Sequence, residues 1–145
     1  MAKKRAIRFG LLFAWLGLTI FLSEQSGAES ANLSSELAKW LINTFSLTIP
    51  HTRLNAFLRE LAHFGIHFIL AILAYRALLT VFNEKLNTFI SLISCSAIAA
   101  FDELSQQHIV GRAREVNDLI LNLLGVSLGI IVGYLMSRPI KKPPQ

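Results

Sequence analysis

The polar side chains that could do chemistry are concentrated between residues 102 and 122. Apolar runs border this stretch on both sides, so its ionisable groups must lie near a membrane surface. Ionisable groups are costly there, and that cost favours a functional role. Carboxylates, amides and a guanidinium can bind a polar ligand or act as general acids and bases. The candidates within the stretch are Asp102, Glu103, Gln106, Arg112, Asp118 and Asn122.

Two interpretations of the acidic residues remain open. In a helix, Asp102 and Glu103 would point to different faces, whereas Asp102 and Gln106 would share one. A pair of carboxylates could serve as general acid and base. The alternative is a helix-end cluster that pairs with Arg112 and Arg114. Because no serine lies in a nucleophile motif, we favour a protein that is not an enzyme.

A second group of polar residues lies at the start of the apolar run 61–82. Glu60, His63 and His67 recur at helical spacing, and Arg59 precedes them. A metal site is conceivable if the acidic residues of the other stretch come close, but the spacing matches no zinc signature. A histidine bonded to a carboxylate is the commoner arrangement. We therefore expect neither a metal nor a cofactor.

Long apolar runs must position these residues. The 145-residue chain is 53% hydrophobic and only 16% charged, which indicates one multi-pass membrane domain over 1–145 rather than a soluble protein. Runs of this length can cross a bilayer core of roughly 30 Å as helices. The predicted spans are about 7–22, 61–82, 86–101 and 119–136. The first run is also short enough to be a cleaved signal peptide, although we favour a retained span.

A further helix is predicted outside the membrane, within the external segment 23–60. Leu33, Leu37 and Trp40 recur at helical spacing opposite polar residues, and Ser34 could cap the helix. Pro50 limits its length. Its amphipathic pattern predicts that it lies in the membrane interface.

Charge distribution predicts the orientation. Four spans place both termini on one side, and nine of the 14 Lys and Arg residues fall on that side. The positive-inside rule then places both termini in the cytoplasm and the loop 102–118 outside. The net charge of +5 could suggest nucleic acid, but basic residues gather at the chain ends. We therefore expect a lipid bilayer, not nucleic acid, as the partner.

The last apolar run carries both packing residues and polar residues on one face. Asp118, Asn122, Gly125 and Gly129 fall at i, i+4, i+7 and i+11. Gly125, Gly129 and Gly133 form a small-residue ladder that lets another helix approach closely. Asp118 and Asn122 require polar partners, and Arg59 or Arg112 are the available cations.

Three sequence elements together resemble the VanZ-like family. They are Arg59-x-x-Ala62-His63-Phe64, Asp102-Glu103-x-x-Gln106 with Gly111-Arg112, and Asp118-x-x-x-Asn122-x-x-Gly125-x-x-x-Gly129. The chain departs from that pattern at Glu60, Ile66, His67 and Val110. The resemblance implies a small multi-pass membrane protein, and the family's namesake is associated with low-level resistance to teicoplanin. It marks as functional Arg59, His63, Asp102, Glu103, Gln106, Arg112, Asp118 and Asn122.

These observations predict an all-α membrane bundle with four transmembrane helices and one external interfacial helix. A polar site at the outer face of the cell membrane would engage a lipid-linked envelope precursor or a lipophilic glycopeptide. Alternatives are an intramembrane enzyme that acts on an envelope lipid, and a structural partner of another membrane complex.

Overall fold

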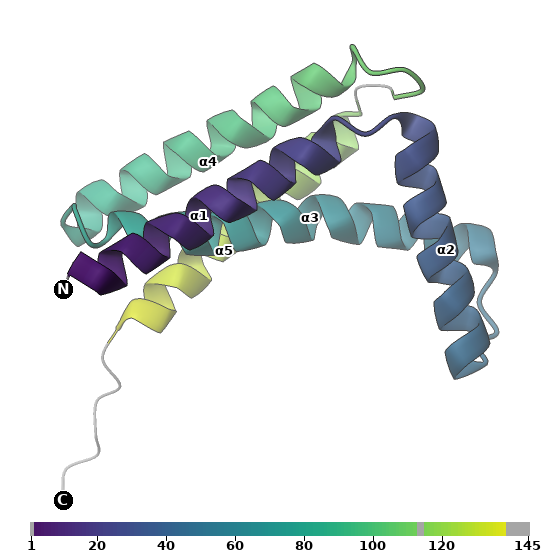
Figure 1. The fold of residues 1–145 in the computed structure, drawn as a ribbon, viewed down its shortest axis with the longest axis horizontal. Helices are drawn as coiled ribbons and strands as arrows, with labels where there is room; N and C mark the ends of the chain where they lie inside the picture. The colour runs from purple at the N-terminus through teal and green to yellow at the C-terminus, as the bar shows by residue number, and fades with distance from the viewer. Residues whose placement is uncertain (1, 113–114, 139–145) are drawn as a thin grey trace, which may run out of the picture.

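The computed structural model describes residues 2–112 and 115–138, and all regular structure in these ranges is helical. The helices, in chain order, are α1 (Ala2–Ser23), α2 (Gly27–Phe45), α3 (His51–Leu78), α4 (Glu84–Gln106) and α5 (Val116–Ser137). Figure 1 shows α1, α4 and α5 running alongside α3, while α2 stands across the first part of α3. The predicted all-α architecture is confirmed.

Four of these helices, α1, α3, α4 and α5, are long and apolar enough to cross a membrane. Their outward faces carry large exposed side chains such as Phe13, Phe21, Phe89, Phe101 and Leu135. Large apolar side chains that point away from the bundle are typical of helices surrounded by lipid rather than by water. The protein is therefore a membrane protein with four candidate spans.

Close packing of α3 against α5 forms the centre of the bundle. A Cβ on Gly125 would overlap the backbone carbonyl of Phe64, and one on Gly129 would overlap that of Phe68. Gly133 faces the side chain of Tyr75. The glycine ladder therefore lets the two helix backbones meet, as its spacing predicts.

Polar bonds connect the other helices to α3. The indole Nε1–H of Trp15 on α1 donates to the carbonyl of Ile66 at 3.0 Å. The amide of Asn87 on α4 donates to the carbonyl of Tyr75 at 3.1 Å, where both residues are buried. The bilayer core holds no water that could bond these polar groups, so hydrogen bonds between helices satisfy them instead.

The amphipathic helix begins earlier than predicted. Its N-cap is Ser26, not Ser34: Ser26 accepts a bond from the N–H of Glu29, while the Glu29 carboxylate accepts one from the N–H of Ser26. Ser34 instead donates to carbonyls within the helix. The helix ends before Pro50, at Phe45, and Pro50 is the N-cap position of α3.

Helix boundaries also change the description of the polar stretch. The segment 102–118 was predicted as a loop, but α4 continues through Gln106, so Asp102, Glu103 and Gln106 lie on its last turns. These three residues are therefore helical, and Glu103 and Gln106 are buried within the bundle. The helices also differ in length from the predicted spans. The helices α1, α4 and α5 extend at both ends beyond the predicted spans 7–22, 86–101 and 119–136. The helix α3 begins well before residue 61 and ends before residue 82.

Candidate functional site

Two connections between helices, α1–α2 and α4–α5, meet at the end of the bundle that is opposite the α3–α4 turn (Figure 1). The N–H of Gly27 donates to the carbonyl of Val110 at 3.0 Å, so the α1–α2 junction lies against the α4–α5 connection. A Cβ on Gly27 would overlap the carbonyl of Gly111, and Gly111 itself has φ +76°. These two glycines permit a contact that fixes the position of the next residue, Arg112.

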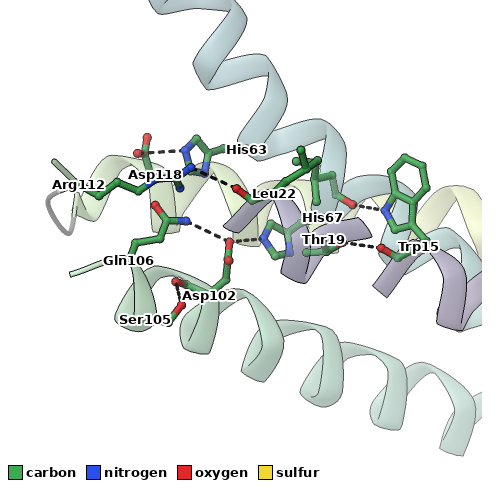
Figure 2. Close-up of polar contacts among 11 residues, drawn as sticks. Trp15, Thr19, Leu22, His63, His67, Asp102, Ser105, Gln106, Arg112 and Asp118 are labelled. Atoms are coloured by element: carbon green, nitrogen blue, oxygen red, sulfur yellow. Dashed lines mark hydrogen bonds and ion pairs between the residues drawn. The ribbon is translucent and has the colours of Figure 1, made fainter. Parts of the chain in front are cut away.

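Arg112 turns back towards α1. Its guanidinium donates to the carbonyl of Leu22 at 3.2 Å, one of the last carbonyls of α1 (Figure 2). Burial lowers the pKa of this guanidinium, and Arg59 lowers it further, while the carboxylates of Asp102, Glu103 and Asp118 oppose the change. Arg112 is therefore a partly desolvated cation within the electrostatic reach of three acidic groups.

One polar contact at this end of the bundle joins α3 to α4. The Nε2 of His67 lies 3.2 Å from Oδ2 of Asp102, and the Gln106 amide donates to the same oxygen at 3.4 Å (Figure 2). His67 is only 1% exposed. Asp102 is partly buried, and a carboxylate removed from water needs hydrogen-bond partners, which the His67 ring and the Gln106 amide supply.

A second histidine–carboxylate pair joins α3 to α5. The Nε2 of His63 lies 3.3 Å from Oδ2 of Asp118, and each side chain keeps some contact with solvent. The predicted cation partner of Asp118 was Arg59 or Arg112, but the observed partner is His63. Because His63 and His67 are one turn apart, they bind carboxylates on two different helices.

Glu103 completes the polar layer from α4. One of its oxygens, Oε1, accepts a bond at 2.7 Å from the N–H of Glu115, just before α5. The other oxygen, Oε2, is buried and has no hydrogen-bond partner within residues 2–112 and 115–138. Asn122 is fully buried, and neither atom of its amide has a partner there. Such groups destabilise a fold unless a ligand, ion or water binds them.

Some of these polar side chains, though not Glu103, Asp118 or Asn122, border an open cavity of about 410 Å³. Its polar lining includes both histidines, Asp102, Gln106, Arg59 and Arg112. Its apolar lining comes from α1, α2 and α3, and includes Leu22, Leu33, Leu37, Leu58 and Ile66. A cavity with one charged region and one apolar region fits an amphiphilic molecule.

The structure brings most of the predicted site residues together at this end of the bundle. His63, Asp102, Glu103, Gln106, Arg112 and Asp118 contact or electrostatically influence one another. Arg59 is exposed and lines the cavity, but makes no ion pair within the described ranges. Asn122 shares the face of Asp118, but its side chain makes no hydrogen bond within the described ranges. Arg114 lies outside the described residues. The sequence interpretation left His67 out of the site, although its spacing from His63 already placed it on the same face.

The architecture defines a class, a multi-pass helical membrane protein with a polar site at one end of the bundle. A family model with the description VanZ/LLP1 matches residues 9–137, and the chain belongs to that family. The match covers all four apolar helices except the first turns of α1. No curated protein matches the chain, and no solved structure matches it.

Proposed function

We propose that the protein binds an anionic amphiphile of the cell envelope in the cavity at the polar end. The observation that carries this proposal is the combination of two arginines and an apolar lining in one cavity of about 410 Å³. The anionic head group would lie against Arg59 and Arg112, and the chain of the ligand along Leu33 and Leu37. Arginine suits this role because its planar donors fit phosphate or carboxylate oxygens.

The charge distribution supports an orientation in which the cavity faces the outer leaflet of the cytoplasmic membrane. The basic residues at the two ends of the chain favour cytoplasmic termini. The first turns of α1 and the last turns of α5 lie at the end of the bundle opposite the α1–α2 junction (Figure 1), and residues next to that junction line the cavity. In this orientation the ligand is a lipid-linked envelope precursor or a lipophilic glycopeptide such as teicoplanin, and binding contributes to glycopeptide resistance or envelope maintenance.

Arg112→Ala tests the proposal. Binding of a polyprenyl phosphate and of teicoplanin to the full chain in nanodiscs is measured for the wild type and the variant. We expect affinity to fall roughly tenfold to a hundredfold, because a charge-assisted contact contributes about 1.5–3 kcal/mol. Arg53→Ala is the matched control, since Arg53 is exposed on α3 and does not line the cavity.

The same pair of variants is then compared in cells for protection against teicoplanin at equal protein abundance. Loss of protection in Arg112→Ala and retention in Arg53→Ala is the expected result. If Arg112→Ala protects and binds like the wild type, the cavity is not the ligand site.

A second candidate function is an intramembrane enzyme that acts on an envelope lipid. The observation in its favour is the His67 ring, whose Nε2 is held by Asp102 while its Nδ1 has no partner in the described part of the chain. A histidine oriented by a carboxylate is a common general base. Turnover of a labelled lipid by the purified protein, lost in His63→Ala and His67→Ala, would favour this function over binding alone.

A further inference from the structure

Three helices each contribute one potential metal ligand to the same point at the polar end. His63 comes from α3, Glu103 from α4 and Asp118 from α5, and one ligand atom of each lies within 4.8 Å of the other two. We propose that these three side chains bind one divalent transition-metal ion. This revises the expectation from sequence, because the spacing along the chain could not show that the three residues converge.

Glu103 carries the proposal furthest. The residue is 1% exposed, and its Oε2 is buried without a hydrogen-bond partner in the described ranges. A buried carboxylate oxygen without a partner is strongly unfavourable, whereas a bound cation would satisfy it. The other oxygen accepts the N–H of Glu115 at 2.7 Å. Such a bond fixes a carboxylate in the orientation that a monodentate metal ligand needs.

His63 and Asp118 provide the other two ligands and the entry path. Nε2 of His63 and Oδ2 of Asp118 are 3.3 Å apart, which is an ion-pair contact when the imidazole nitrogen carries a proton. A metal ion replaces that proton when it binds, as at other histidine sites. Both side chains retain partial exposure, so an ion can reach them from solvent without a rearrangement of the helices.

The donor set favours a particular class of ion. One imidazole and two carboxylates suit Zn²⁺, Mn²⁺ or Fe²⁺, whereas Mg²⁺ and Ca²⁺ prefer oxygen ligands alone. Bonds of about 2.1 Å in a tetrahedral site put ligand atoms about 3.4 Å apart, so the side chains must draw together by roughly 1 Å. Three protein ligands leave a fourth position for water or a ligand.

Neighbouring charges are compatible with the ion. Glu103 and Asp118 together supply two negative charges for a divalent cation. Arg112 lies within the field of both carboxylates, but its guanidinium donates to the carbonyl of Leu22 rather than to either of them. Arg112 therefore does not occupy the Oε2 of Glu103, which is left without a partner in the described ranges. The inference goes beyond the proposed lipid binding and does not rest on it, since an ion can be titrated without any lipid ligand.

Calorimetric titration of Zn²⁺ into the chelator-treated full chain in detergent tests the proposal. We expect one ion per chain in the wild type. The key variant is Glu103→Gln, which keeps an acceptor for the Glu115 N–H but is a poor metal ligand. Its affinity for Zn²⁺ should fall by roughly tenfold or more. Co²⁺ provides a second reading, because its visible absorption reports the ligand geometry.

Glu60→Gln is the matched control, because Glu60 is exposed, lies near His63 and is outside the cluster. Asp118→Asn gives an independent variant if Glu103→Gln does not fold, and circular dichroism reports folding for each. The proposal is overturned if the wild type binds no Zn²⁺ more tightly than about 1 mM. It is equally overturned if Zn²⁺ binds but the folded Glu103→Gln or Asp118→Asn variant binds as tightly as the wild type.

Discussion

The contact between α3 and α5 has two different parts along one face of α5. Towards the middle of the bundle, Gly125 and Gly129 bring the backbones together and leave no room for a side chain. One or two turns earlier, Asp118 and Asn122 occupy the same face, and there the contact is polar and incompletely paired. One helix face thus changes from close packing to a site with unsatisfied groups.

The difference shows how a small membrane protein can hold a polar site in place. Backbone contact along the glycines fixes the rotation and depth of α5 relative to α3. That rotation then places Asp118 against His63, and it leaves Asn122, one turn further along α5, fully buried. The glycines need no polar partner, whereas Oε2 of Glu103 and the amide of Asn122 have no hydrogen-bond partner in the described part of the chain.

The largest expected effect comes from the packed part. Gly125→Ala places a Cβ against the Phe64 carbonyl, and backbone cannot move aside as a flexible side chain can. We expect a loss of about 3 kcal/mol in the free energy of unfolding, measured by denaturant titration in detergent. Gly65→Ala is the control, because a Cβ on Gly65 meets nothing within 4 Å. The control should be neutral or stabilising by up to about 1 kcal/mol.

A comparison of Gly125→Ala with Arg112→Ala also separates two functional interpretations. If the protein is a structural partner of another membrane complex, substitutions on the glycine face should matter more in cells than substitutions of the charged residues. If it binds a ligand, Arg112→Ala should abolish function at normal abundance. Equal stability of Gly125→Ala and Gly65→Ala would show that the two parts of the α3–α5 contact do not differ as described.

A smaller effect is expected from the buried histidine pair. Asp102→Ala removes the carboxylate that accepts from His67 and Gln106, and it leaves both groups buried without that partner. We expect a loss of about 2 kcal/mol in the free energy of unfolding. Asp102→Asn retains an oxygen acceptor and should lose less. The expectation fails if the alanine variant unfolds at the same denaturant concentration as the wild type.

The fold was largely predictable because the signals that specify it are local. Four apolar runs predicted four long helices, and the i, i+4 spacing of Gly125 and Gly129 predicted close packing. The continuation of α4 through Gln106 was missed, because polar residues after an apolar run resemble a loop when their buried surroundings are unknown. Glu103 is part of α4 and is buried against other helices.

The candidate site was only partly predictable because its pairings are not local. The spacing placed His63 and His67 on one face, but it could not show that one binds Asp118 and the other Asp102. Opposite charge suggested arginine as the partner of Asp118, yet Arg112 is directed to the Leu22 carbonyl by the contact of Gly27 with Gly111. That contact joins segments far apart in sequence.

The smallest expected effect lies outside both parts of the α3–α5 contact, at the capping box of α2. Ser26→Ala removes the acceptor for the Glu29 N–H and should destabilise the start of α2 by about 1 kcal/mol. Amide hydrogen exchange should accelerate in the first turn of α2. Exchange in α3 and α5 should not change, because the glycine contacts hold those helices independently.

Acidification should mimic this substitution. Hydrogen bonds from the Ser26 side chain and backbone lower the pKa of Glu29 in the folded state. Because the folded-state pKa is lowered, the ionised carboxylate stabilises the start of the helix fully at pH values above the ordinary pKa of 4.5. That stabilisation is lost as pH falls through the lower, folded-state pKa. Because intrinsic amide exchange slows in acid, the quantity to compare is the protection factor, the ratio of the intrinsic to the observed exchange rate. This factor should fall in acid in the first turn of α2 for the wild type and much less for Glu29→Gln. An equal fall in both would show that the capping carboxylate does not control this helix end.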